Sequence, residues 1–262
     1  MAALLTAENV CKNYGAFRAL SGVSFSIAEE EFVAIVGPNG AGKTTLVNVL
    51  TGLLKPNAGQ VLFEGRDIAG LGPVELSRRG MARAFQLVQI FPTLTVRETL
   101  AIAMASRGGQ IRNMLRRLSA GRSMHAECEH VAALFKLGGR LETPAAHLSQ
   151  GEKKLLDIAS AFTLKPGIIL LDEPTSGVST SEKHGLMKVL LNAAQAAGIR
   201  SIILVEHDME LVSRYSRRVI AMQEGRILAD LPTASFFANE KLVAAVAGKP
   251  PVIPGNADAL RH

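Results

Sequence analysis

The chain contains five short runs of residues that are almost entirely apolar. They lie at residues 32–36, 60–63, 168–171, 201–205 and 218–222. Short, continuous, β-branched runs are typical of strands whose two faces are both covered, whereas a half-exposed strand alternates. The last run is followed by Glu224 and Gly225 and then by a second run at 226–229, which predicts a hairpin. We therefore expect a mostly buried sheet.

Helical periodicity alternates with these runs. Between residues 179 and 197, apolar side chains recur every three or four positions, as they do on one face of a helix. Ser179 and Glu182 have the spacing of a capping box at the start of this segment, and Gly198 is a suitable stop. A strand–helix–strand order favours an α/β fold whose central sheet is parallel.

Three other segments do not follow this alternation. Residues 4–27 indicate antiparallel strands with turns at 14–15 and 21–22. Residues 94–163 are rich in Ala, Leu, Met and Arg with few β-branched runs, which predicts a helical subdomain inserted between strands. We therefore expect one domain at 1–248, with a core at about 1–90 and 164–248 and the subdomain at about 91–163, followed by an extended Pro-rich tail at 249–262.

Composition narrows the class of protein. The 262 residues are 48% apolar, enough for one large domain, and no run approaches the roughly 18 apolar residues of a membrane span. The first residues show no leader pattern, so we expect a protein that is soluble or attached to a membrane through a partner. Cys11 and Cys128 are far apart and lack the spacing of a zinc site, which fits a reducing compartment.

The net charge of +6 is compatible with nucleic acid or an anionic membrane face as partner. Aromatic residues make up only 5% of the chain, which argues against a base-stacking platform, and we expect no nucleic acid. Most basic residues are scattered, but four of them cluster at Arg112, Arg116, Arg117 and Arg122. This cluster is either a solvated helix face or a patch that faces a membrane or a partner.

Residues 37–44 match the phosphate-loop pattern Gly-x-x-x-x-Gly-Lys-Ser/Thr. The match follows the run at 32–36 and precedes a helical pattern at 44–50, which is the context that the motif requires. Glycines let backbone N–H groups turn toward phosphate oxygens, Lys43 supplies positive charge at the β- and γ-phosphates, and Thr44 offers a hydroxyl to Mg²⁺. The residues expected to bind the nucleotide are Gly37, Asn39, Gly40, Gly42, Lys43, Thr44 and Thr45.

Two acidic residues, Asp172 and Glu173, follow the run at 168–171. Ligands of open α/β sheets bind at the carboxyl ends of the strands. We expect Asp172 to hold Mg²⁺ and Glu173 to orient and polarise an attacking water. Taken alone, Glu173 is equally well explained as a cap of the next turn. Beside a phosphate loop, the catalytic interpretation is the stronger one.

Residues 148–152, Leu-Ser-Gln-Gly-Glu, precede the acidic strand with a helical pattern in between. They resemble the signature motif of ABC ATPases. With the phosphate loop, Gln86 and His207 they follow the order found in that family, and the resemblance covers about residues 4–231. It implies an α/β fold with a P-loop NTPase core, a mostly parallel sheet, N-terminal antiparallel strands and an inserted helical subdomain. It also implies an enzyme that hydrolyses ATP with Mg²⁺.

The resemblance also implies roles for single residues. Tyr14 is placed like the aromatic residue that stacks on adenine. Gln86 matches the glutamine that contacts Mg²⁺ and the attacking water, and His207 matches the histidine at the γ-phosphate. Ser149 and Gly151 match residues that contact the ATP bound to a partner subunit.

The sequence departs from the family pattern at two places. Gln150 and Glu152 stand where the signature usually has Gly and Gln. Ser179 stands where the family usually has Asp. A serine can still cap the following helix, but it does not bring a carboxylate charge to the dimer interface.

Residues 205–209, Val-Glu-His-Asp-Met, and 82–86, Ala-Arg-Ala-Phe-Gln, resemble the ATPases of branched-chain, or hydrophobic, amino acid importers. Relatives in that group handle urea or small aromatic acids, so the solute stays open. The resemblance implies integral membrane permease subunits, a second ATPase subunit arranged head to tail as a homo- or heterodimer, and, indirectly, an extracytoplasmic solute-binding protein. The chain is then expected to be peripheral to the cytoplasmic face of the cell membrane.

Three other classes of protein are weaker explanations. Soluble ABC ATPases that act on nucleic acid or ribosomes usually carry two nucleotide modules or a long coiled coil, and this chain has one module without sustained heptads. A small kinase or GTPase would explain the phosphate loop and Asp172, but not residues 148–152 or His207. An inactive structural partner would not need Lys43, Thr44 and Glu173 to be intact.

Overall fold

The computed structural model describes residues 3–84, 91–107 and 122–246. Gln86, Arg112, Arg116, Arg117 and the tail at 249–262 lie outside these ranges, and what the sequence predicts for them stays a prediction. Among the helices in the described ranges, none has both the length and the apolar character that crossing a membrane requires.

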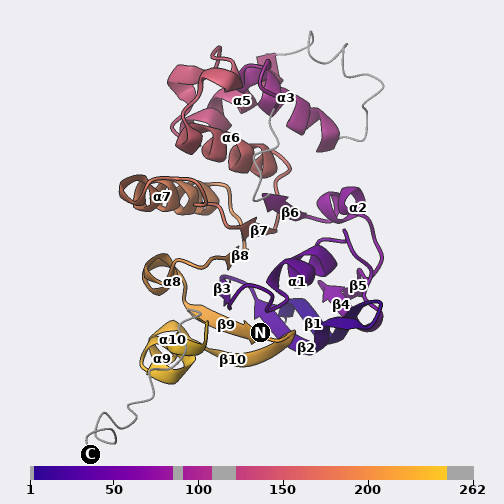
Figure 1. Ribbon diagram of the computed structural model, residues 1–262. Helices are drawn as coiled ribbons and strands as arrows, with labels where there is room; N and C mark the ends of the chain where they lie inside the picture. The colour runs from indigo at the N-terminus through magenta and orange to yellow at the C-terminus, as the bar shows by residue number, and fades with distance from the viewer. Residues whose placement is uncertain (1–2, 85–90, 108–121, 247–262) are drawn as a thin grey trace, which may run out of the picture.

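A six-stranded sheet forms the centre of the molecule (Figure 1). Its order is β10-β9-β3-β8-β7-β6, and every neighbouring pair is parallel except the hairpin of β9 and β10. The strands are β3 (Phe32–Val36), β6 (Met81–Ala84), β7 (Ile168–Asp172), β8 (Ser201–Val205), β9 (Arg218–Gln223) and β10 (Arg226–Pro232). The expected mostly parallel sheet and its terminal hairpin are confirmed.

Every residue of β3, β7 and β8 is buried, which is why these strands are apolar throughout. Their side chains still alternate between the two faces of the sheet. Ile168 and Leu170 join the core that contains helix α1 (Lys43–Leu50), whereas Ile169 and Leu171 join the core on the helical side. The uninterrupted apolar pattern of β7 therefore reflects two separate hydrophobic cores. In β3, Ala34 and Val36 belong to a third core near α8 (Met209–Tyr215), α9 (Thr233–Phe237) and α10 (Glu240–Val246).

A second, four-stranded antiparallel sheet has the order β2-β1-β4-β5 and packs on α1. Its strands are β1 (Ala3–Tyr14), β2 (Phe17–Ala28), β4 (Ala58–Phe63) and β5 (Arg66–Asp67). The expected antiparallel N-terminus and its turn after Tyr14 are confirmed. The assignment of run 60–63 to the buried parallel sheet is wrong, because the first half of β4 is exposed and the strand pairs with β1.

The turn expected at 21–22 is also absent, because β2 continues through both residues. Val10 pairs with Val23 and Lys12 pairs with Leu20, so two residues of β2 lie opposite one residue of β1. Gly22 has a φ of +71° at this extra residue. The glycine therefore marks a β-bulge. Bulges, like turns, can require a residue in the left-handed backbone conformation.

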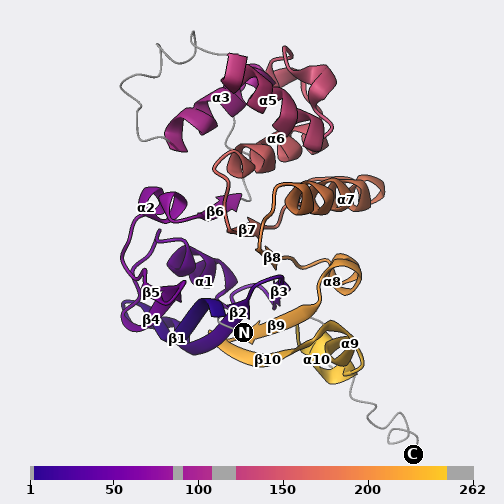
Figure 2. The same ribbon diagram turned by 180° about the vertical axis from the view of Figure 1, so that it is seen from behind.

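Helices pack against both faces of the six-stranded sheet (Figures 1 and 2). Helices α3, α5 and α6 lie together beyond the β6 edge, as expected for the helical segment, and α9 and α10 lie near the β10 edge. The helices besides α1 are α2 (Pro73–Arg78), α3 (Val96–Arg107), α5 (Arg122–Leu134), α6 (Gln150–Phe162), α7 (Thr180–Ala196), α8 (Met209–Tyr215), α9 (Thr233–Phe237) and α10 (Glu240–Val246).

The capping box expected at the start of α7 is not formed. The Ser179 hydroxyl donates to Glu182 Oε2 at 2.5 Å, and the side chain accepts no hydrogen bond from the helix backbone. The complete capping box occurs at α6, where Ser149 Oγ accepts from the Glu152 N–H and Glu152 accepts from the Ser149 N–H. Both sites share the Ser-x-x-Glu spacing, so the spacing alone does not determine whether the capping box forms.

Candidate active site

A pocket of about 210 Å³ lies at the carboxyl ends of β3 and β8, where the chain enters α1. This is the edge at which open α/β sheets bind ligands. The first part of β2, the loop before α1 and the residues after β7 all contribute to it. The pocket is lined by Phe17, Ala19, Asn39, Gly40, Ala41, Gly42, Lys43, Thr44, Thr45, Glu173 and Val205.

The loop before α1 keeps its shape because neighbouring backbone packs directly against it. Gly42 has a φ of +96°, and a Cβ at this position would lie 2.6 Å from Ala19 O. A Cβ at Gly37 would lie 2.3 Å from Met222 O. Glycine is therefore required by contact distance at both positions and by backbone conformation at Gly42.

Lys43 points back over this loop. Its ammonium donates to Gly37 O at 2.7 Å and to Pro38 O at 3.0 Å, and the residue is buried. Burial lowers the pKa of this ammonium, and the nearby charges of Glu173 and Asp172 act in the opposite direction. The loop thus holds a buried cation next to two carboxylates, which suits a ligand that carries several negative charges.

Asp172, the last residue of β7, is fixed by an arginine that the sequence analysis did not single out. Arg83 in β6 donates through Nη2 to Asp172 Oδ2 at 2.6 Å and through Nη1 to Asn48 Oδ1 at 2.6 Å. The side chains of Arg83 and Asp172 are only 8% and 5% exposed, so little water competes for this ion pair. One guanidinium therefore connects β6, β7 and the helix that follows the loop.

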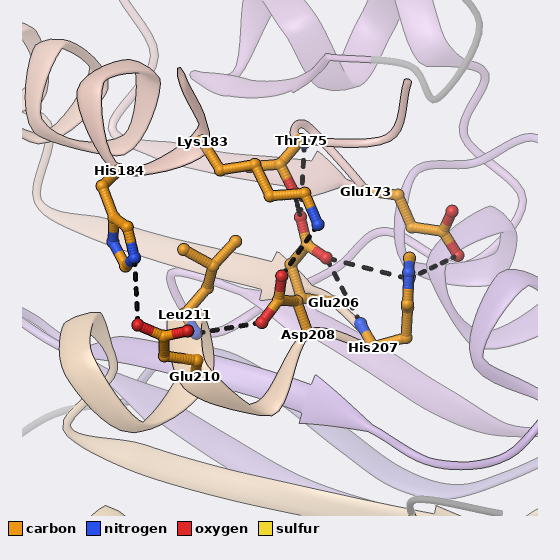
Figure 3. Close-up of polar contacts among 9 residues, drawn as sticks. All are labelled: Glu173, Thr175, Lys183, His184, Glu206, His207, Asp208, Glu210 and Leu211. Atoms are coloured by element: carbon orange, nitrogen blue, oxygen red, sulfur yellow. Dashed lines mark hydrogen bonds and ion pairs between the residues drawn. The ribbon is translucent and has the colours of Figure 1, made fainter. Parts of the chain in front are cut away.

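Glu173 lines the pocket, and His207, which does not line it, faces the Glu173 carboxylate (Figure 3). Glu173 Oε1 lies 4.0 Å from His207 Nδ1. Glu173 has a φ of +48°, and its N–H donates to Val205 O at 2.9 Å, so the strand that precedes His207 also holds the backbone of Glu173. A non-glycine residue in this left-handed conformation is uncommon and strained.

The amino-acid sequence of residues 20–176 matches the family model described as ABC transporter. The chain belongs to the ABC transporter family. It is 35% identical over 230 residues, 87% of this chain and 89% of the relative, to a probable branched-chain amino acid transport ATP-binding protein LivG of Methanocaldococcus jannaschii. It is 31% identical to a high-affinity LivG protein of Escherichia coli, covering 94% of this chain and 98% of the relative.

Solved ABC structures share the fold. The crystal structure of the ADP conformation of an ATP-binding cassette of an ABC transporter superposes with a TM-score of 0.83 at 32% identity. The match covers 95% of this chain and all of the other. The protein is therefore an ABC ATPase, a nucleotide-binding subunit that hydrolyses ATP, as the motifs in its sequence predicted.

Most residues that the sequence singled out in this ABC ATPase lie at the pocket. The lining residues include Asn39, Gly40, Gly42, Lys43, Thr44, Thr45 and Glu173. Gly37 accepts from Lys43, Asp172 lies close enough to act on the Lys43 charge, and His207 lies beside Glu173. Gln86 falls outside the described residues.

Tyr14 does not line the pocket, whereas Phe17 does. The two residues pair across the β1–β2 hairpin, and their side chains are 49% and 64% exposed. Lys12 Nζ lies 5.8 Å from the centre of the Tyr14 ring. Phe17 was missed by the sequence analysis, although directly paired residues of a two-residue hairpin lie on the same face and could have indicated it.

Ser149 and Gly151 do not reach this pocket either. They stand at the start of α6, on the other side of β6 and β7 from α1 (Figure 1). Ser149 is exposed, and its N–H donates to the Glu152 carboxylate, which lowers the pKa of Glu152. The described part of one chain thus separates the phosphate loop from the signature residues.

Proposed function

We propose that this ABC ATPase powers an importer for branched-chain or other hydrophobic amino acids. Relatives with that function in their names are 31–35% identical over most of the chain, which supports the assignment. Urea or a small aromatic acid is the alternative solute, because the resemblance at residues 82–86 and 205–209 extends to such importers. The transported solute does not contact this subunit in the proposed arrangement.

The observation that carries the proposed mechanism is that Lys43 and Glu173 line one pocket, while His207 Nδ1 lies 4.0 Å from Glu173 Oε1. The backbone of the loop and Lys43 bind the β- and γ-phosphates of ATP, and Thr45 and Asn39 line the same cradle. Glu173 holds and polarises the attacking water, and His207 contacts the γ-phosphate. Because phosphoryl transfer depends mostly on positioning and charge neutralisation, these groups suffice for hydrolysis. Phe17, beside Tyr14, is the aromatic residue that we propose for contact with adenine.

The residues present also fit Mg²⁺. The Thr44 hydroxyl at the pocket and the Asp172 carboxylate at the end of β7 are oxygen donors, the ligands that Mg²⁺ prefers. We propose these two residues, with Gln86, as the protein groups that hold the ion. Bound Mg²⁺ neutralises charge that develops on the phosphate oxygens. Arg83 keeps the Asp172 carboxylate in one orientation.

A second ATPase subunit completes the site in this proposal. Ser149 and Gly151 lie at the exposed start of α6, away from the phosphate loop of their own chain. Two subunits arranged head to tail place these residues against the ATP of the partner. The simplest second subunit is another copy of this chain.

We further propose that the subunit lies on the cytoplasmic face of the cell membrane and is attached through integral permease subunits. Leu53, Val74 and Phe91 are large apolar side chains with exposed fractions of 45%, 66% and 62%. Leu53 and Pro73 also line an apolar cavity of about 140 Å³. We propose that the permease contacts the surface around this cavity, where Leu53 and Pro73 bring apolar side chains together.

Uptake by intact cells tests the proposed function. Cells that lack the gene are supplied with either the wild-type chain or Lys43→Ala, and the accumulation of labelled leucine, urea and benzoate is compared. The proposal expects leucine uptake to depend on the wild-type chain and to be lost with Lys43→Ala. Uptake of urea or benzoate alone would assign the alternative solute, and no dependence for any of them would overturn the import function.

A further inference from the structure

Glu206 is a fully buried carboxylate that belongs to the motif at residues 205–209 but has no role in the proposed mechanism. It is 0% exposed and follows β8 directly, next to His207. Burying an ionised carboxylate is costly unless hydrogen bonds and opposite charges compensate it. A buried acid beside an active site therefore needs a physical explanation.

The hydrogen bonds of Glu206 connect the two segments that carry Glu173 and His207 (Figure 3). Glu206 Oε1 accepts from Thr175 Oγ1 at 2.7 Å and from the Thr175 N–H at 3.3 Å. Glu206 Oε2 accepts from the His207 N–H at 3.3 Å and lies 3.8 Å from His207 Nδ1. Each carboxylate oxygen thus holds one of the two segments.

The hydrogen bonds between Glu206 and Thr175 lie close to Glu173, a residue with a strained backbone conformation. Glu173 precedes Thr175 by two positions and keeps its φ of +48°. Such a conformation persists only when the surrounding structure fixes the chain on both sides. On one side the Glu173 N–H donates to Val205 O, and on the other side Thr175 is held by Glu206.

A lysine from the helical part supplies a compensating charge. Lys154 in α6 is buried, and burial lowers the pKa of its ammonium. Nearby carboxylates act in the opposite direction, and they belong to Asp157, Glu206, Glu173 and Asp172. The helix that begins at the signature residues thus places a positive charge near Glu206 as well as near Asp157.

We propose that Glu206 is a positioning residue for ATP hydrolysis. It holds the turn after β7 and the residue after β8 in fixed relation, so that Glu173 and His207 keep their separation at the γ-phosphate end of the pocket. The inference rests on the roles proposed above for Glu173 and His207. Glu206 should therefore affect the rate of ATP hydrolysis and leave the contacts of the phosphate loop with ATP unchanged.

Helices α7 and α8 are also joined by side-chain contacts that do not involve Glu206. Lys183 and Asp208 form an ion pair at 2.8 Å, and His184 lies 3.1 Å from Glu210 (Figure 3). These pairs join α7 to the start of α8 on the outer side of Glu206. Removing Glu206 therefore leaves the packing of the two helices supported, and its effect on turnover can be measured apart from folding.

The test uses the purified full-length chain and compares ATP affinity with turnover in four variants. Glu206→Gln keeps the shape of the side chain. If its amide oxygen accepts from Thr175, its NH₂ group faces the His207 N–H, and two donors cannot form a hydrogen bond with each other. Thr175→Val removes the hydroxyl with little change in volume, and Thr175→Ser restores it. Glu210→Gln, at the exposed hydrogen bond with His184, is the control.

Glu206→Gln and Thr175→Val are expected to lower kcat about tenfold, with the Kd for ATP within about twofold of wild type, because a charged hydrogen bond is lost away from the phosphates. Thr175→Ser recovers most of the kcat, and Glu210→Gln matches wild type. The double variant of Glu206→Gln and Thr175→Val is no slower than the slower single variant, since both remove the same contact. Thermal melting shows whether each variant folds. If Glu206→Gln does not fold, the kcat values of Thr175→Val and Thr175→Ser test the inference instead.

Wild-type kcat in Glu206→Gln and Thr175→Val would overturn the inference, as would an equal loss of ATP affinity and kcat. Glu173→Gln, measured in parallel, separates this failure from failure of the proposed mechanism. If Glu173→Gln turns over ATP normally, the role of Glu173 itself is wrong. If Glu173→Gln is inactive while Glu206→Gln and Thr175→Val are normal, only the inference about Glu206 fails.

Discussion

The phosphate loop and the start of α6 both contribute to the proposed ATP site, but the fold stabilises them in opposite ways. Around the loop, backbone from β2 and β9 approaches so closely that Gly37 and Gly42 have no room for a Cβ. At α6, Ser149 is exposed and is held by a capping box within its own helix. One half of the site is therefore fixed by the tertiary core, and the other half is a local structure at the surface.

This difference has a physical consequence. The phosphate loop is shaped in a single chain, since its contacts come from strands of the same chain. The start of α6 is also shaped within a single chain, but the phosphate pocket of that chain lies elsewhere. Substitutions in the first region should damage fold and binding together, whereas those in the second should affect local stability.

Glu173→Gln is expected to have the largest effect. Loss of the carboxylate that polarises the attacking water should lower kcat by about 10² to 10⁴, which is the usual contribution of general acid–base catalysis. The loop and Lys43 are unchanged, so the Kd for ATP should stay within about threefold of wild type. Single-turnover hydrolysis and equilibrium binding measure the two quantities. Turnover at the wild-type rate would remove Glu173 from its assigned role.

Gly42→Ala should lower both stability and ATP binding. The new Cβ would meet Ala19 O at 2.6 Å in a left-handed backbone conformation, so we expect a loss of about 3 kcal/mol in the free energy of unfolding and no measurable ATP binding. Gly15→Ala is the matched control, because Gly15 has a φ of +58° with open space around its Cβ position. It should cost about 1 kcal/mol and leave binding intact. Equal effects of the two variants would contradict the close-packing argument.

Ser149→Ala should have a smaller and local effect. The variant loses the side-chain cap of α6, which typically costs about 1 kcal/mol in the free energy of unfolding. Ser149→Thr keeps a cap and serves as the control. Chemical denaturation of the two variants measures the difference. A loss as large as that of Gly42→Ala would mean that the start of α6 is part of the tertiary core after all.

The smallest effect concerns pH at the same capping box. The Ser149 N–H stabilises ionised Glu152, which lowers the pKa of Glu152 from its ordinary value of 4.5. The stability contributed by this carboxylate is therefore present above about pH 4.5 and is lost as the pH falls through the lower, folded-state pKa. The difference in free energy of unfolding between wild type and Glu152→Gln should shrink as the pH falls from 7 toward 3. A difference independent of pH would contradict the charged cap.

The sequence predicts the buried half of this protein well because its physical constraints are local. Strands covered on both faces leave continuous apolar runs, and close backbone approach leaves glycines at fixed spacing, so β3, β7, β8 and the phosphate loop were all predictable. Asp172 and Glu173 follow from their place at a strand end.

What the sequence did not predict depends on partners far away in the chain. The four residues of β6 form a strand because they pair with β7, and Arg83 within it matters because it reaches Asp172. The sequence around Gly22 fits a turn as well as a bulge, and only the pairing of β2 with β1 shows that it is a bulge. Phe17 reaches the pocket through the tertiary position of the hairpin, and Tyr14 beside it does not.

If two subunits complete each ATP site, the solution mass of Glu173→Gln should depend on ATP. This variant should bind ATP without consuming it, so the closed state accumulates. We expect ATP with Mg²⁺ to convert the monomer to a dimer, and Lys43→Ala to stay monomeric under the same conditions. A Glu173→Gln chain that binds ATP fully and remains a monomer would contradict the claim that two copies of this chain close around the nucleotide.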